Sequence, residues 1–360
     1  SNGQTLTAAK LVKLNSITTG LITVHSNITK ISGNSADVKA IYEAFDATAT
    51  ATTQITGIAT NMPIDVVDEA LSASDLAYID TKNGTGHIAA TAAVDSVVGS
   101  IADITTVYGN AGGAGVANKI SGIADEPITV TGTATVDQIN VLDDGTSPVT
   151  SAGITATISD GSSTELATLA STGNALSITI TDAAVTAANL RTINLATTVA
   201  VDMSAVTSVT GTMAHLTHSY ATQKAGLTGL GNEALTASDA TISIANANLL
   251  TGYTTGLATA TIADSTKAQL DVLTSSANAY SVKVTDTSIA ASDANAINAK
   301  TTGLVTFDAT AITGALSDVK ALYEANVAGT VASLGNEAVT ISDTGTVKAA
   351  DIDSVSYTHL

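Results

Sequence analysis

The stretches ITITDAAVTAANLRTINLATT (178–198) and VKVTDTSIAASDANAINAKTT (282–302) follow the same order of residue types. Each begins with apolar and polar side chains in alternation, which is the pattern of a half-buried strand. After an Asp and a short connection, a segment with helical spacing follows, as with Leu190 and Ile193 behind Thr186 at the expected N-cap. Each stretch therefore predicts a strand followed by a short helix.

Both stretches belong to longer blocks, because residues 176–234 align with residues 280–338. The pentapeptide LGNEA closes both blocks, from Leu230 and from Leu334, a separation of 104 residues. LGNEA repeats at the separation of the blocks, and it therefore indicates a joint: Gly and Asn allow a turn, and Glu-Ala leads into the next strand.

A second signature places a Tyr nine residues after a Gly, with Asp or His and then an aliphatic residue between them. It occurs four times and ends at Tyr42, Tyr108, Tyr220 and Tyr323. The recurrence favours a packing role over a unique site. We expect each ring to cover the end of a block, with its hydroxyl at solvent or at a backbone carbonyl.

The strand and helix patterns recur along the chain at intervals of roughly 20 to 30 residues, a spacing typical of solenoid repeats. The strand-like segments are 154–160, 177–182, 259–264, 281–286 and 339–343, and the helix-like segments are 7–14, 72–79, 135–142, 186–193 and 266–273. The predicted fold is an α/β solenoid whose repeated strand-helix units stack a parallel β-sheet against short helices. The alternative is a row of tandem β-sandwich domains, which would lack the intervening capped helices.

The blocks divide the chain into a series of segments, with a tail that resembles nothing upstream. The predicted segments are a partial block (1–63), a block (64–127), a short block (128–175), a long block (176–234), a short block (235–279), a long block (280–338), a truncated block (339–354) and a non-native tail (355–360). The first residues lack the basic and apolar build of a signal peptide, so we expect a processed or cut N-terminus.

Composition excludes several classes of function. Of 360 residues, 44% are hydrophobic but only 3% are aromatic, and 32 acidic side chains against 13 basic ones give a net charge of -19. This charge disfavours nucleic acid as a partner, since phosphate binding needs clustered Lys and Arg. With 0 Cys there is no disulfide, thiolate metal site or thiol nucleophile. No apolar run reaches the roughly 18 residues of a membrane-spanning helix, so no membrane insertion is expected.

Acidic residues that follow strands form the candidate metal site. They are Asp160, Asp182, Asp264, Asp286 and Asp343. Equivalent positions on stacked parallel strands lie about 4.8 Å apart, so a cation could bridge these carboxylates. Calcium is the natural candidate, because it prefers all-oxygen ligand sets. The competing interpretation makes the same residues turn formers and helix caps, which need no metal.

Other candidate chemistry is weaker. Threonines alternate along several strands, as at Thr155/Thr157 and Thr259/Thr261, and an outward hydroxyl ladder of this kind is a pattern of ice-binding surfaces. His215 and His218 have helical spacing for one zinc ion, but no third ligand accompanies them, and a solvated helix face accounts for them. No nucleophile elbow, P-loop or zincin pair occurs, so we expect no catalytic residues and no enzyme activity.

The segments VTDTSIAASDANAINAKTTGLVTFDATAITGALSDVKALYEA (284–325) and GLGNEALTASDATISIANANLL (229–250) resemble the very long, acidic, Ala- and Thr-rich repeat proteins of bacterial cell surfaces, of the cyanobacterial type. The resemblance implies secretion, an extracellular location at the cell surface and a structural or adhesive role, as in a surface layer, filament or stalk. We therefore expect a self-associating rod whose partners are neighbouring repeats of the same protein. The alternative is an adhesin-type module for glycan, mineral or ice, with repeats stabilised by Ca²⁺.

Overall fold

The chain folds into two compact units. The computed structural model describes residues 3–45, 55–91, 94–110, 120–123, 126–143, 153–170, 172–274, 277–346 and 352. The first unit comprises Ser1–Thr179 with Leu195–Ala200, and the second comprises Ile180–Asn194 with Val201–Leu360. The predicted tail (355–360) lies outside the described residues, and the predicted block boundaries remain a prediction.

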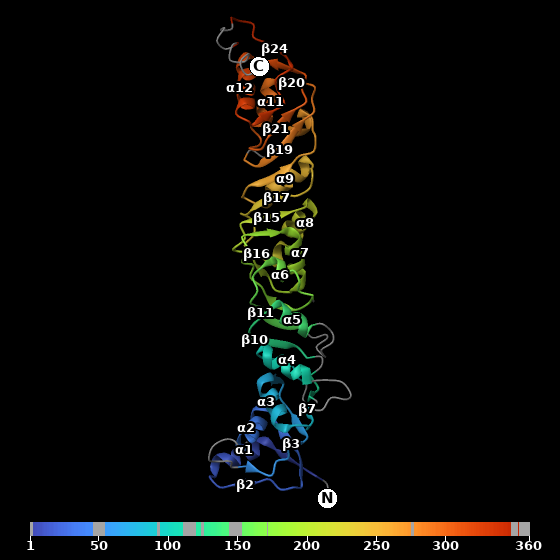
Figure 1. Cartoon of the computed structure of the whole chain (residues 1–360), viewed down its shortest axis with the longest axis vertical. Coiled ribbons are helices and arrows are strands. Elements are labelled where there is room, and N and C mark those ends of the chain that lie inside the picture. The colour runs from blue at the N-terminus through green and yellow to red at the C-terminus, as the bar shows by residue number, and fades with distance from the viewer. Residues whose placement is uncertain are drawn as a thin grey trace. The chain divides into compact units, whose positions relative to one another are not determined.

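In the first unit, helices recur along the chain with one to three strands between them (Figure 1). Its elements are β1 (Gln4–Thr7), α1 (Ala8–Ile17), β2 (Ile22–Thr23), β3 (Ile28–Gly33), α2 (Ser35–Phe45), β4 (Ile55–Thr56), β5 (Ile64–Val66), β6 (Ala70–Ser72), α3 (Ala73–Asn83), β7 (Ile88–Ala90), β8 (Ser96–Gly99), α4 (Ile101–Asn110), β9 (Ile120–Ser121), β10 (Ile128–Ala134), α5 (Val136–Leu142), β11 (Ile154–Ile158), α6 (Ser163–Leu166) and β12 (Ala175–Ser177).

The second unit has the same order of strands and helices. Its elements are β13 (Ala184–Thr186), α7 (Ala187–Ala196, most of which belongs to this unit), β14 (Val201–Asp202), β15 (Ser208–Gly211), α8 (Met213–Thr217), the π-helix His218–Thr222, the 3-10 helix Lys224–Gly226, β16 (Leu227–Thr228), β17 (Ala234–Ala237), α9 (Ile244–Tyr253), β18 (Ala258–Thr261), α10 (Lys267–Leu270), β19 (Ala279–Val284), β20 (Ser288–Ala290), α11 (Ala291–Asn298), β21 (Val305–Phe307), β22 (Ala311–Gly314), α12 (Leu316–Val327), β23 (Val331–Ala332) and β24 (Ala338–Ile341).

The strand pairs assigned among the described residues are parallel. The first unit has sheets in the order β1-β3-β5-β7-β9, β12-β11-β10-β8-β6 and β2-β4. The second has β13-β15-β17-β18-β19-β21-β23, β14-β16 and β20-β22-β24. Most neighbouring strands are joined through a helix, which is the crossover that parallel pairing requires. A row of β-sandwich domains would lack helices between its strands, whereas helices recur between the strands of the described residues.

We call one helix, together with the strands between it and the preceding helix, a rung. Successive rungs place equivalent side chains in register: Ile31 pairs with Ile64, Ile64 with Ile88, and Ile88 with Ile120. The second unit repeats the arrangement with Val185, Val209, Leu235 and Ala258. These side chains are buried, and each large aliphatic one contributes roughly 1.5–3 kcal/mol. The core is thus a column of aliphatic residues in each unit.

The expected helix starts are present at several rungs. Thr135 accepts a hydrogen bond from the backbone of Gln138, which completes a capping box at the start of α5. Ser72 accepts from Asp75 at the start of α3. Four of the five predicted strand segments contain a strand at their start or centre. In the remaining one, 177–182, only Ser177 belongs to a strand. The chain is therefore an α/β protein in which parallel sheets alternate with helices.

Candidate functional site

The LGNEA loop at 230–234 holds a buried carboxylate. Glu233 is 2% exposed, and its Oε1 accepts a hydrogen bond from the hydroxyl of Tyr220. Its Oε2 accepts from the backbone N–H groups of Gly231, at 2.8 Å, and Asn232, at 3.0 Å. Ala234 then begins β17, so the loop is the joint that its sequence predicts. The Glu side chain additionally fastens this joint to the helical segment that carries Tyr220.

The second LGNEA loop repeats these contacts. Glu337 is 4% exposed, and its Oε1 accepts from the hydroxyl of Tyr323. The N–H groups of Gly335 and Asn336 donate to Oε2 at 2.8 and 3.0 Å. Two copies of one sequence thus make the same arrangement of three donors around one carboxylate. These hydrogen bonds compensate the negative charge, which burial separates from water.

Burial and hydrogen bonding set the protonation states of this pair. Burial raises the pKa of Glu337, but the hydrogen bonds from Tyr323 and from backbone N–H groups together outweigh it, and the pKa lies below its usual value. Burial, with the neighbouring carboxylate, raises the pKa of Tyr323 far above its usual value. Glu337 is therefore ionised and Tyr323 neutral near pH 7.

The expectation for the repeated tyrosines was half right. Tyr42, Tyr108, Tyr220 and Tyr323 are all buried packing residues, as predicted. The hydroxyls of Tyr42, Tyr220 and Tyr323 donate to side chains, however, and not to solvent or a backbone carbonyl. Tyr42 donates to Asn83 Oδ1 at 2.9 Å, and the other two donate to glutamates. A side-chain acceptor at these sites lies 13 to 41 residues away, so no local pattern could reveal it.

A second recurring contact caps helices across rungs. In five cases, an Asp that follows a strand accepts a hydrogen bond from the first backbone N–H of the preceding rung's helix. The pairs are Ser35 with Asp68, Val136 with Asp160, Met213 with Asp239, Lys267 with Asp286 and Leu316 with Asp343. The carboxylate satisfies one of the orphan N–H groups of a helix and lies at the positive end of its dipole.

These caps include three of the five candidate calcium ligands: Asp160, Asp286 and Asp343. Asp264 lies 3.7 Å from Lys283 and is largely exposed, and Asp182 is half-buried between β12 and β13. Within the described ranges, no group of three or more His, Cys, Asp or Glu side chains is arranged to hold a metal ion. The three caps each use one carboxylate oxygen, and calcium binding stays a prediction.

A pair of adjacent threonines forms a third contact, which was not predicted from the sequence. It occurs at Thr197–Thr198, Thr254–Thr255 and Thr301–Thr302. The first hydroxyl is buried and donates to a backbone carbonyl of the preceding rung, as from Thr301 to Tyr280 at 2.7 Å. The second donates to another carbonyl, as from Thr198 to Asn174 at 3.1 Å. The recurrence of TT after helices was the available signal.

Lys300 and Asn278 add contacts of the same kind. The Lys300 ammonium donates to the carbonyl oxygens of Leu270, Asp271 and Leu273, at 3.2, 2.7 and 2.9 Å, and so caps the end of α10 with positive charge. Asn278 accepts from the backbone N–H of Ala258 at 2.9 Å. Like the Tyr, Asp and Thr side chains, they bind one rung to the previous one.

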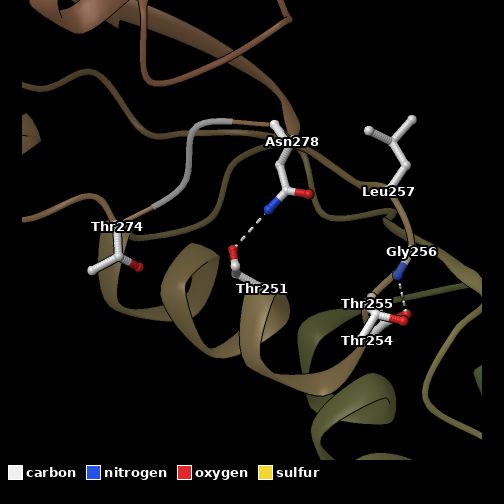
Figure 2. A pocket seen from close by; sticks show the side chains of 8 residues that line it. Thr251, Thr254, Thr255, Gly256, Leu257, Thr274 and Asn278 are labelled. Carbon is white, nitrogen blue, oxygen red and sulfur yellow. Dashed lines mark hydrogen bonds between the residues drawn. The ribbon is translucent and has the colours of Figure 1, made fainter.

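One pocket of about 390 Å³ opens between α9 and the connections that follow α9 and α10 (Figure 2). Its lining residues are Thr251, Thr254, Thr255, Gly256, Leu257, Thr274, Ala277 and Asn278. In Figure 2, Thr274 faces it from one side and the Thr254–Gly256 connection from the other. Asn278 and Thr251 lie between them, joined by a hydrogen bond of 2.9 Å.

The other candidate residues occupy outward positions. Thr186, Thr210, Thr236 and Thr259 pair in register on four adjacent strands, and their side chains are exposed or half-buried. His215 on α8 and His218 at the start of the π-helix are both half-buried. Neither set is joined by further ligand-type side chains among the described residues.

Among the described helices, none is long and apolar enough to cross a membrane. No family model matches the chain, and neither a curated protein nor a solved structure matches it.

Proposed function

We propose that this chain is a structural segment of a secreted cell-surface repeat protein, of the kind that builds a surface layer, filament or stalk. The observation that carries the proposal is the use of the recurring polar residues. The Tyr–Glu pairs, the Asp caps and the threonine pairs all bind one rung to the preceding one. A chain selected to hold its repeats together in this way serves a mechanical role, and the role is non-enzymatic.

The proposed architecture behind this role is an α/β solenoid. Parallel sheets within each unit, with equivalent side chains in register from rung to rung, support it. In such a fold each repeat contacts its neighbours, so stability is approximately a sum of repeat and interface contributions. A single rung could not bury its aliphatic side chains alone, and length is therefore built by adding rungs.

The extracellular location and the bacterial surface family belong to the same proposal. Their support is the acidic, Cys-free composition together with the resemblance of residues 229–250 and 284–325 to surface repeat proteins. The net charge of -19 suits a soluble surface that attracts cations.

Self-association is the testable part of the proposal. Exposed sheet edges favour addition of further strands, so copies of the chain are expected to associate. Sedimentation velocity on the full 360-residue chain, from micromolar to millimolar concentration, measures this directly. Growth of larger species with concentration is the expected result. A single monomeric species over the whole range would count against the proposal.

The alternative is an adhesin-type module with calcium-stabilised repeats, and its support is the acidic Asp series. Thermal unfolding in millimolar calcium and then in excess chelator separates the two roles of these residues. A large calcium-dependent rise in Tm would assign cation sites to Asp160, Asp182, Asp264, Asp286 and Asp343. An unchanged Tm would leave three of them as helix caps alone.

A further inference from the structure

The pocket beside α9 is lined by a peptide whose sequence is repeated in the second unit. The peptide TTGL occurs at 254–257 and again at 301–304. The two copies have equivalent places, since Leu235 donates its N–H to the Leu257 carbonyl and Val282 donates to the Leu304 carbonyl, both at 2.9 Å. The first copy lines the pocket, and the residues of the second copy are not part of its lining. The threonine contacts therefore explain the fold of TTGL, and they leave the cavity itself without a structural role.

The threonine hydroxyls around this pocket have already committed their protons. Thr251 donates to the Ala247 carbonyl at 3.0 Å, and Thr254 donates to the Glu233 carbonyl at 2.6 Å. Thr255 donates to the Gly231 carbonyl, and Thr274 donates to Asn248 Oδ1, at 3.2 and 3.1 Å. The Thr251 and Thr254 oxygens also accept hydrogen bonds, from Asn278 Nδ2 and from the Gly256 N–H, both at 2.9 Å. The Thr255 and Thr274 oxygens therefore supply the lone pairs that a ligand could use. A ligand that fits this lining must supply the hydrogen-bond donors.

The lining also selects against charge. None of its eight residues is charged, so an anion would find no counterion and would face a chain with a net charge of -19. A cation would find no carboxylate in the lining. Leu257 and Ala277 supply an apolar wall beside the hydroxyls. Hydroxyl donors on an apolar ring are the features of a neutral sugar.

We propose that this pocket binds one residue of a neutral glycan, with sugar hydroxyls donating to the Thr255 and Thr274 oxygens and the sugar ring against Leu257. Its volume of about 390 Å³ lies at the small end of ligand pockets, which span roughly 300–1,000 Å³, and suits a single sugar ring. This binding does not depend on the structural role proposed above. It gives the adhesin-type alternative a specific site and a class of ligand.

The affinity for a single sugar is low, because no aromatic ring lines the pocket to stack on it. Repetition of such modules along a longer protein would raise the avidity for a polymeric glycan. The first measurement therefore needs a method that detects weak binding to a single sugar.

The test is a backbone-amide NMR titration of the full chain with methyl glycosides of glucose, galactose and N-acetylglucosamine, and separately with spermidine. We expect saturable shifts at Gly256 and Ala277 with at least one glycoside, at millimolar half-saturation. No saturable shift with any glycoside would overturn the proposal. Saturation by spermidine in place of the glycosides would overturn it too, in favour of a cation site.

Two variants locate the binding. Ala277→Phe fills the pocket with a phenyl ring, and we expect it to weaken the glycoside affinity by about tenfold or more. Thr255→Val removes one acceptor oxygen and should weaken it severalfold. Thr198→Val is the matched control, because Thr198 makes the equivalent hydrogen bond to the Asn174 carbonyl and lies outside the pocket lining. Equal loss of affinity in Thr198→Val and Thr255→Val would overturn the proposed site.

Discussion

The hydroxyl of Tyr323 donates a hydrogen bond to the carboxylate of Glu337, 14 residues later, at the loop that begins β24. Tyr220 and Glu233 make the same contact in the preceding copy of LGNEA. Burial of a carboxylate costs free energy, which its three hydrogen-bond donors offset. Loss of any one donor destabilises the fold, because the buried charge is then less compensated. This pair therefore fixes each helix to the start of the next strand, and it yields the most direct tests.

Removal of the Tyr323 hydroxyl should destabilise the second unit. We expect Tyr323→Phe to lower the free energy of unfolding by about 1.5–3 kcal/mol, the contribution of a hydrogen bond to a charged group. Urea unfolding followed by circular dichroism measures the change. Tyr78→Phe serves as the control, since the Tyr78 ring is half-buried and lies near Lys39 and Lys82. Equal effects of the two variants would contradict the inferred contact.

Acid should weaken the same contact. Because the folded state lowers the pKa of Glu337, the stability that this group contributes is present above the unfolded-state value of about 4.3. It is lost as the pH falls from there through the folded-state pKa. Urea midpoints measured between pH 6 and pH 3 should therefore fall less steeply in Glu337→Gln than in the native chain. Glu324→Gln, at an exposed position of α12, should keep the native slope.

Alkali should unfold the chain through its tyrosines. Burial raises the pKa values of Tyr42, Tyr220, Tyr280 and Tyr323 above the usual value near 10. A group whose pKa is raised on folding contributes stability below its unfolded-state pKa and loses it as the pH rises further. We expect tyrosinate absorbance from these residues to appear together with loss of circular dichroism above about pH 10. Full tyrosine ionisation with retained secondary structure would show that the rings are accessible.

Substitution of a helix-capping Asp should lower the free energy of unfolding by an amount that depends on whether an acceptor oxygen remains. Asp239→Ala removes the acceptor of the Met213 N–H, at 2.7 Å, and should cost about 1 kcal/mol of unfolding free energy, as losses of helix caps do. Asp239→Asn, which keeps an acceptor oxygen, should cost less. Asp264→Ala is the control, because this side chain makes a long, exposed ion pair that contributes little. A larger effect at Asp264 than at Asp239 would contradict the assignment of the caps.

Lys300 should matter more than an ordinary surface lysine. Lys300→Met keeps the aliphatic stem but removes three hydrogen bonds to the end of α10, and we expect a loss of about 1–2 kcal/mol in urea unfolding. Lys320→Met is the matched control, since Lys320 pairs with Glu324 at 4.0 Å on the surface of α12. If both variants lose the same free energy, the capping role is wrong.

Local sequence pattern was sufficient to predict those elements whose interactions join residues close in sequence. The Thr135 capping box and the helix behind it could be predicted because the cap and its partner Gln138 are three residues apart. The alternation in 154–158 predicted the strand whose Ile and Ala side chains are buried and whose Thr side chains are exposed. Segment 177–182 alternates equally well, yet only its first residue belongs to a strand and Thr179 forms a bridge. Formation of a full strand depends on a neighbouring strand that alternation does not supply.

The sequence by itself determined that strands and short helices alternate, that LGNEA is a joint, and that the repeated tyrosines are packing residues. These properties depend on side-chain periodicity and backbone freedom, which act over a few residues. Only the tertiary structure decided that the Glu of LGNEA accepts from a Tyr of the preceding helix, and that Asp160, Asp286 and Asp343 cap helices 19 to 27 residues before them. The same holds for the pocket lined by TTGL. A hydrogen bond between rungs depends on which strand lies beside which, and the free energy that selects this register comes from burying whole columns of aliphatic side chains together.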